Sequence, residues 1–158
     1  MKKLALMALV ATMSVQALAT KVGVVNTQEL FYKYSKTKAM DENIRKQTSA
    51  LDNTLKQKQV ELQKMELELK AKGAKVTDKE KKAFEDKIKL LEKFVKDSQI
   101  KLNKERAARM AEIEKVMQNA IDKVAKSEKA DYVLEAGAVK FGGVDITSKV
   151  LAEMEKSK

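Results

Sequence analysis

The chain has 158 residues and a formal net charge of +10, with 35% charged and 4% aromatic residues and neither proline nor tryptophan. It also contains no cysteine and no histidine, which removes disulfides, the best transition-metal ligands and the usual nucleophile–base pairs. We therefore expect no catalytic site, no bound metal and no cofactor, and the composition is typical of a coiled coil rather than of a compact globule.

The first 19 residues have the pattern of a secretory signal peptide. Two lysines precede an apolar run over residues 4–15, and the Ala-Leu-Ala sequence at residues 17–19 is the small-x-small pattern that signal peptidase recognises. The apolar run is shorter than the roughly 20 residues that a membrane-spanning helix needs. We therefore predict cleavage after Ala19 and export of the mature chain, rather than a retained membrane anchor.

Loss of the signal would remove Lys2 and Lys3 and leave 31 basic against 23 acidic residues, a net charge of +8. A positive surplus of this size favours polyanions or acidic clients as partners, through an attraction that salt screens. The charge alone does not identify which of these the partner is.

Two heptad-patterned stretches, residues 39–72 and 78–129, flank a short link over residues 73–77. Apolar side chains recur every three and four residues in both stretches, which predicts a seam of contact positions in a coiled coil. In the first stretch the predicted seam is Ile44, Thr48, Leu51, Leu55, Lys58, Leu62, Met65 and Leu69. In the second it is Phe84, Ile88, Leu91, Val95, Ser98 and Leu102, after which the phase shifts through Arg106 to Met110, Ile113, Met117, Ala120 and Val124.

The link contains the signals for the end of one helix and the start of another. Gly73 stands where a helix C-cap would fall, and Thr77 and Glu80 have the spacing of a capping box. Folding back about this link would place Leu62 near Ile88 in an antiparallel hairpin. The first arm would then run out opposite residue 111, so the end of the second helix must pack on another part of the chain.

The two ends of the mature chain supply that part. Short apolar runs at residues 21–25, 132–134 and 139–141 predict three strands. The sequence Asp-Ile-Thr at residues 145–147 then predicts the cap of a closing helix. These elements would form one small α/β body.

The predicted fold class is mostly α, with a long antiparallel coiled-coil hairpin inserted in a small β-containing α/β body. The body comprises residues 20–38 and 112–158, and the arm comprises residues 39–111. A body of about 50 residues has a marginal core without disulfides or metal, so we expect oligomerisation. We place Val22 and Val24 at the subunit interface because an open strand edge pairs readily with another subunit.

The order of these parts resembles the Skp (OmpH-like) family of periplasmic chaperones over the whole chain. The resemblance is carried by the charged hairpin, by the strand that ends Gly-Val-Val-Asn at residues 23–26 and by the strand at residues 132–134. It ends with Asp-Ile-Thr at residues 145–147, followed by Val150 and Leu151. Residues 135–144 depart from the pattern, since they are compact and Gly-rich and lack the longer loop of many members.

The resemblance implies a periplasmic homotrimer in which three bodies form a β-rich hub and three arms enclose a cavity. Members of the family hold unfolded outer membrane proteins there without ATP. The implied function is therefore that of a holdase chaperone that prevents aggregation of outer membrane β-barrel proteins, with no enzymatic activity.

Two sets of side chains on the arm are candidate client-binding residues. The apolar set falls outside the predicted seam, so some members should be exposed: Val60, Leu67, Leu90, Phe94 and Ile100. The basic set lies at the tip: Lys70, Lys72, Lys75, Lys79, Lys81 and Lys82. The alternative interpretation is an ordinary solvated tip with scattered apolar surface residues.

Two other functions stay open, an envelope coiled-coil structural protein and a protein that binds a polyanion such as lipopolysaccharide. Polar side chains at seam positions 48, 58, 98 and 106 argue against a stiff structural rod. Export and the lack of interleaved aromatic residues argue against nucleic acid as a partner. Anionic lipid and lipopolysaccharide stay open as partners of the basic tip.

Overall fold

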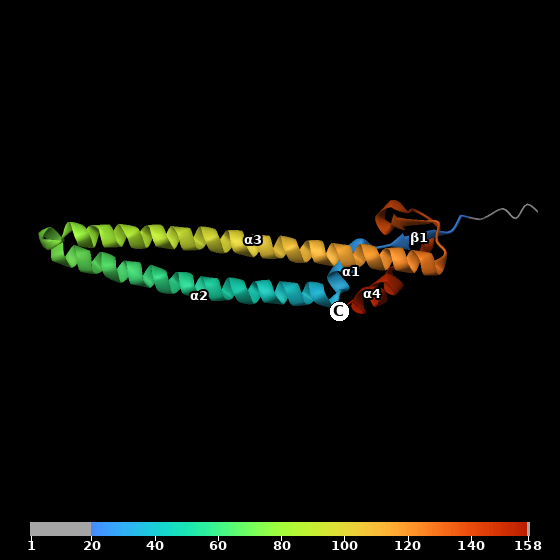
Figure 1. Ribbon diagram of the computed structural model, residues 1–158, viewed down its shortest axis with the longest axis horizontal. Coiled ribbons are helices and arrows are strands. Elements are labelled where there is room, and N and C mark those ends of the chain that lie inside the picture. The colour runs from blue at the N-terminus through green and yellow to red at the C-terminus, as the bar shows by residue number, and fades with distance from the viewer. Residues whose placement is uncertain (1–19, 158) are drawn as a thin grey trace, which may run out of the picture.

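A computed structural model describes residues 20–157 of the chain. Two long helices form an extended hairpin, and the remaining elements gather into a body at the end opposite the hairpin tip (Figure 1). The predicted signal peptide, residues 1–19, lies outside the described residues. The mostly helical fold with a small β-containing body is confirmed.

The arm consists of helices α2 (Ser35–Lys72) and α3 (Asp78–Glu128), which run side by side in opposite directions (Figure 1). A single 3-10 turn, η1 (Gly73–Lys75), joins them near the tip. Gly73 caps the first helix with a φ of +51°, and Thr77 and Glu80 form the predicted capping box. The helix boundaries agree with the prediction, except that α2 begins four residues earlier, at Ser35.

Polar contacts between the two helices confirm the antiparallel register. The Gln47 amide donates hydrogen bonds to the Glu105 carboxylate at 3.0 Å, and Lys87 pairs with Glu61 at 3.3 Å nearer the tip. Both pairs fit a hairpin that reverses within residues 73–77.

The contact face of α3 departs from the predicted seam at three positions between residues 95 and 110, whereas the predicted positions 98 and 102 are half-buried and those from 113 to 124 are buried. Val95 is 44% exposed, whereas Phe94, predicted outside the seam, is half-buried. Glu105 is half-buried while Arg106 is exposed, and Met110 is exposed as well. A straight helix with 3.6 residues per turn does not match a strict seven-residue repeat, so single positions can leave the contact face while the seam continues on either side of them.

The body contains a three-stranded parallel sheet in the order β2-β1-β3. Its strands are β1 (Val22–Val25), β2 (Tyr132–Glu135) and β3 (Val144–Asp145). The first two strands were predicted, but the strand predicted at residues 139–141 is wrong. The third strand lies a few residues further along the chain.

Two glycines displace this strand. After the 3-10 turn η2 (Ala136–Ala138), Gly142 and Gly143 adopt φ values of +83° and +85°, in the left-handed region that glycine reaches without a steric penalty. A Cβ atom on Gly143 would lie only 2.4 Å from Cγ2 of Val24. This turn lays Gly143 against β1 and lets Val144, rather than residues 139–141, pair with that strand.

The prediction that β1 has an open edge is wrong, because β1 is the central strand of the sheet. Val24 lies opposite Leu134 on one side and Asp145 on the other, so both edges of β1 are occupied within the chain. The edge argument therefore does not support an interface at Val22 and Val24. Any open edge of the sheet belongs to β2 or β3.

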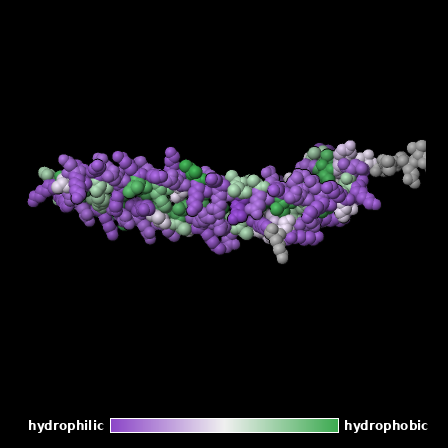
Figure 2. All heavy atoms as spheres, viewed as in Figure 1, coloured by the Kyte–Doolittle hydropathy of each residue, from purple (hydrophilic) through white to green (hydrophobic). Residues whose placement is uncertain are grey.

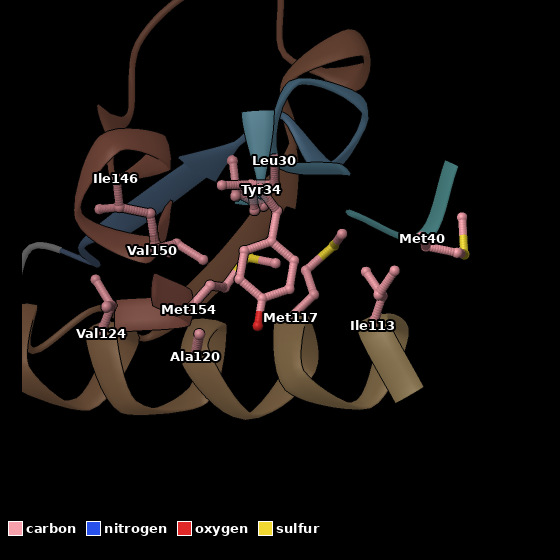
Figure 3. Packing of buried hydrophobic residues seen from close by; sticks show 11 residues of the cluster. Leu30, Tyr34, Met40, Ile113, Met117, Ala120, Val124, Ile146, Val150 and Met154 are labelled. Atoms are coloured by element: carbon pink, nitrogen blue, oxygen red, sulfur yellow. The ribbon is translucent and has the colours of Figure 1, made fainter. Parts of the chain in front are cut away.

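Helices α1 (Thr27–Lys33) and α4 (Thr147–Glu155) pack with the root of α3 to form the core of the body (Figure 3). The carboxylate of Asp145 accepts a hydrogen bond from the Thr147 N–H at 2.8 Å, which confirms the predicted start of the closing helix. The buried apolar cluster is Val25, Leu30, Tyr34, Met40, Ile113, Met117, Ala120, Val124, Ile146, Val150 and Met154. It lies almost entirely at the root of the arm.

Candidate functional site

The described residues contain no cluster of three or more His, Cys, Asp or Glu side chains with the geometry of a metal site. None of the helices within residues 20–157 is both long and apolar enough to cross a membrane. The candidate functional features are therefore surfaces of the arm and of the sheet.

The predicted apolar set on the arm is exposed at four of its five positions. Val60, Leu67, Leu90 and Ile100 have between 49% and 64% of their surface accessible. Phe94 is the exception, because its ring is half-buried and lies 5.4 Å beneath the ammonium group of Lys58. This contact is a cation–π interaction within the hairpin, so the ring is less available to a partner than the other four side chains.

An open groove between the two helices adds an apolar surface that the sequence did not reveal. It lies halfway along the arm, has a volume of about 680 Å³, and its apolar lining is Leu55, Leu91, Val95 and Ile100. Three of these residues were assigned to a closed seam. The only signal in the sequence is the off-seam position of Ile100, because the heptad pattern places Val95 in the seam although it is exposed.

The exposed apolar side chains are spread along the arm rather than gathered in one patch. Figure 2 shows small hydrophobic areas separated by hydrophilic surface over the whole length of the hairpin. Leu90 and Ile100 lie on one helix and are separated by about 15 Å at 1.5 Å per residue. The arm thus offers several separate apolar contact points on a highly charged surface.

The basic tip is partly neutralised. Lys70 pairs with Glu66 at 2.6 Å, Lys81 pairs with Asp78 at 3.4 Å, and Lys72 pairs with Glu80. Within residues 20–157 the other three predicted lysines make no ion pair: Lys75, Lys79 and Lys82. The positive charge available to a partner is therefore smaller than the count of lysines indicates.

The strongest electrostatic effect at the tip is on Glu80. The hydrogen bond from Lys72, together with hydrogen bonds from the Thr77 N–H and hydroxyl, lowers the pKa of Glu80 from 4.5 to about 2. The same contact with Glu80 raises the pKa of Lys72. These groups close the turn, so they are structural parts of the tip rather than free charges.

The outward face of strands β1 and β2 is apolar. Val22 lies opposite Tyr132 and Val24 opposite Leu134, so these four side chains share the face that points away from the buried Val25. Tyr132 and Leu134 are exposed, whereas Val22 and Val24 are half-buried and Gly143 lies against Val24. The exposed apolar part of this face thus comes from β2, while Asp145 of β3, which pairs with Val24, adds an exposed carboxylate. Tyr132 and Leu134 are two positions apart, so the alternation of a strand could have indicated that they share a face.

The comparisons with known proteins agree with this geometry. Residues 21–154 match the family of OmpH-like outer membrane proteins. A similar solved structure is that of a proposed outer membrane chaperone (OmpH-like) from Caulobacter crescentus, with a TM-score of 0.66 and 17% sequence identity over 88% of this chain and 86% of that chain. No curated protein matched the chain. At this identity the solved structure supports the fold alone.

Proposed function

Because the chain belongs to the OmpH-like (Skp) family, we propose that it is an ATP-independent holdase chaperone of the periplasm. In this proposal it binds unfolded outer membrane β-barrel proteins and prevents their aggregation. The observation that carries the proposal is the row of exposed apolar side chains along a long, charged arm.

An unfolded β-barrel protein offers apolar side chains at alternate positions over a long chain. Four separate contact points, Val60, Leu67, Leu90 and Ile100, can bind several such segments weakly at once. Several weak contacts on one scaffold give a long residence time without forcing the client into one conformation. The positive charge would speed the encounter with acidic client segments and have less effect on dissociation.

The proposed assembly is a homotrimer joined through its body. The body has one small core, and the sheet leaves Tyr132 and Leu134 exposed on its outward face. Replacing Leu134 with Lys should leave the fold of one chain intact, because the side chain is already 45% exposed, but it should prevent association. Light scattering should then show a monomer, and an unchanged trimer would exclude this face as the interface.

The holdase activity is tested by suppression of the aggregation of a denatured outer membrane protein on dilution. Serine at Val60, Leu67, Leu90 and Ile100 should shorten client residence by about tenfold or more, since a loss of about 1.5 kcal/mol of apolar burial corresponds to that factor. The matched control places serine at exposed alanines of the same helices, Ala71, Ala83, Ala107 and Ala108. Equal residence for both variants, with both trimeric, would exclude these side chains as the binding surface.

The tip lysines can be tested separately. Glutamine at the three unpaired lysines, Lys75, Lys79 and Lys82, should slow client capture at low salt and have little effect at high salt, because the Debye length shortens to about 8 Å at 0.15 M. The alternative function that these lysines favour is that of a protein that binds a polyanion such as lipopolysaccharide. It would bind lipopolysaccharide vesicles with a steep salt dependence and would not suppress aggregation.

A further inference from the structure

The arm helix α2 begins without a cap of its own. A single residue, Tyr34, separates it from α1 and serves both as the C-cap of α1 and as the N-cap of α2. Its side chain makes no capping hydrogen bond. The Thr37 N–H bonds to the Tyr34 carbonyl at 3.2 Å, but the N–H of Ser35, the first residue of this 38-residue helix, has no backbone partner among the described residues.

The missing cap is supplied by the other end of the chain. The carboxylate of Glu155, the last residue of α4, accepts a hydrogen bond from the Ser35 N–H at 2.8 Å and a second one from the Ser35 hydroxyl. The two residues are 120 positions apart in the sequence. A carboxylate at a helix N-terminus is also favoured by the helix dipole.

Helix α4 is itself firmly attached to the body. Its residues Val150 and Met154 are fully buried in the core beside the root of α3. The hydrogen bonds of Glu155 therefore connect the root of α2 to a fixed element.

The other arm helix, α3, continues without interruption from the arm into the core of the body. The arm is thus supported by α3 itself, by Tyr34, Thr37 and Met40, which are buried at the root of α2, and by the contact between Ser35 and Glu155. Between these supports lies an open cavity of about 280 Å³, which is lined in part by Met40, Arg109 and Ile113. The cavity leaves space between the two helices at the junction of arm and body, where a bend of the arm would be accommodated.

A bend at the root of the arm would move Ser35 a short distance and the arm tip a long one. Helix axes pack about 8–10 Å apart, so bending the arm by about 10° at its root would slide Ser35 by about 1.5 Å along α3 and break its hydrogen bonds to Glu155. The arm portion of α3 is about 50 Å long at 1.5 Å per residue, so the same bend would move the tip by about 9 Å. A small slip at Ser35 therefore corresponds to a large displacement at the tip.

We propose that Glu155 is a positioning residue that latches the root of the arm and sets its direction relative to the body. The latch concerns the fold of one chain and stands whether or not the proposed chaperone function holds. In a trimer it would set how far apart the arm tips lie.

The absence of cysteine allows a clean distance measurement. Exposed serines at positions 49 on α2 and 148 on α4 can be changed to cysteine and spin-labelled, with labelled chain diluted into unlabelled chain so that only distances within one chain are measured. In the chain that keeps Glu155, the distance between the two labels should have one narrow distribution. Glu155→Ala should broaden it by several ångströms with the helix content unchanged by circular dichroism.

Glu153→Ala is the matched control, because it removes a carboxylate two residues away on the same helix that pairs with Lys123 and Lys156 and not with α2. It should leave the distribution narrow. Ser35→Ala keeps the backbone hydrogen bond and should broaden the distribution less than Glu155→Ala does. If Glu155→Ala fails to fold, Glu155→Gln, which keeps one acceptor oxygen, provides the intermediate case.

Two results would overturn the latch. One is a distribution that stays narrow when the Glu155 carboxylate is removed in a folded chain. The other is equal broadening by Glu153→Ala, which would show that α4 is loosened as a whole. Suppression of client aggregation measured on the same variants reports separately on the proposed function.

Discussion

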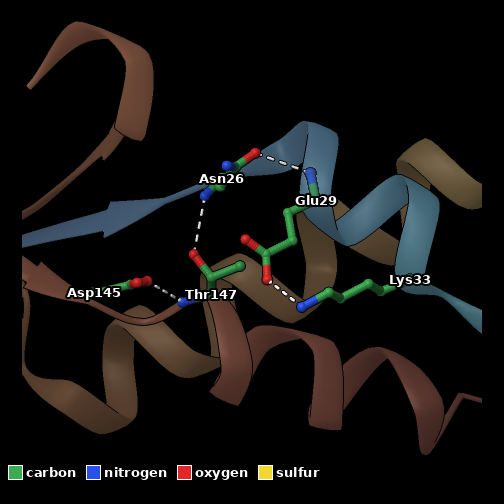
Figure 4. A network of polar contacts seen from close by, with 5 residues as sticks. All are labelled: Asn26, Glu29, Lys33, Asp145 and Thr147. Atoms are coloured by element: carbon green, nitrogen blue, oxygen red, sulfur yellow. Dashed lines mark hydrogen bonds and ion pairs between the residues drawn. The ribbon is translucent and has the colours of Figure 1, made fainter.

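The backbone N–H of Asn26 donates a hydrogen bond of 3.0 Å to Oγ1 of Thr147, across 121 residues of sequence (Figure 4). The Asn26 side chain also caps α1 by accepting a hydrogen bond from the Glu29 N–H at 2.9 Å. The Asp145 carboxylate in turn accepts the Thr147 N–H. The end of β1 and the start of α4 are thus held together by one polar network. This network explains why Asn26, Asp145 and Thr147 stand at these two points of the chain.

Replacement of Thr147 with Val tests this network. The side chain is 5% exposed, and valine keeps its shape while leaving the Asn26 N–H without its acceptor. An unsatisfied buried donor costs about 1–3 kcal/mol, so the free energy of unfolding in urea should fall by that amount. Thr48→Val is the control, because Thr48 is exposed and only bonds to the carbonyl of Ile44 in its own helix. It should change stability by less than about 0.5 kcal/mol.

Removal of the buried Tyr34 hydroxyl, unlike removal of the Thr147 hydroxyl, should not lower the stability of the fold. The side chain is fully buried, and its hydroxyl has no hydrogen-bond partner within the described residues (Figure 3). Burial raises the pKa of this hydroxyl, and the nearby carboxylates of Glu155 and Glu112 raise it further. Tyr34→Phe should therefore leave the free energy of unfolding unchanged or raise it by up to about 1 kcal/mol.

Tyr34→Ala, in contrast, should cost about 3–5 kcal/mol, because it empties the centre of the core. Urea unfolding measures both variants. A loss of more than about 1 kcal/mol in Tyr34→Phe would mean that the hydroxyl has a favourable partner, such as a buried water.

Local signals in the sequence predicted the arm well. Gly73, Thr77 and Glu80 act within a few residues of one another, so the ends of both helices could be identified from the sequence. The position of β1 between two other strands depends on pairing with residues more than 100 positions away, which no local pattern encodes.

The features of the candidate sites also fall into two groups, those that a local pattern predicts and those that depend on distant residues. The exposure of Val60 and Leu67 follows from helical periodicity and was predicted. The hydrogen bonds between Ser35 and Glu155 join residues 120 positions apart, and nothing in either segment indicates the other. The groove lies beside Val95, which the heptad pattern assigned to the closed seam, so the pattern did not predict it.

The two adjacent glycines before β3 give a matched pair of variants. Gly142 and Gly143 have similar positive φ values, so alanine at either position carries a similar backbone penalty of about 1–2 kcal/mol. A Cβ atom at Gly142 meets nothing within 4 Å, whereas one at Gly143 would lie 2.4 Å from Val24. Gly143→Ala should therefore lower the melting temperature more than Gly142→Ala does.

The cause can be identified by a second substitution. Val24→Ala removes the clashing methyl group, so the double variant with Gly143→Ala should be more stable than the sum of the two single changes predicts. Strict additivity in thermal unfolding would show that the contact between Gly143 and Val24 is not the source of the difference.

The pKa of Glu80 predicts how the tip responds to acid. Its folded pKa of about 2 lies below the ordinary value of 4.5, so the ionised carboxylate stabilises the turn above pH 4.5, and this stabilisation is lost as the pH falls from 4.5 through 2. The carboxyl carbon of Glu80, followed by NMR, should titrate near pH 2 in the unsubstituted protein. The N-terminus of α3 should fray over the same pH range, because the protonated Glu80 side chain no longer accepts the hydrogen bond of the capping box as a carboxylate.

The hydrogen bond from Lys72 is the largest cause of the shift, followed by those from Thr77. Lys72→Gln should therefore raise the pKa of Glu80 toward 4.5, while the Thr77 hydrogen bonds keep it below that value. Lys70→Gln is the matched control, because Lys70 pairs with Glu66 instead and its loss should leave the Glu80 titration unchanged. If Glu80 titrates at its ordinary value in the unsubstituted protein, the turn is not closed by this carboxylate, and the tip must be held by η1 and Gly73 alone.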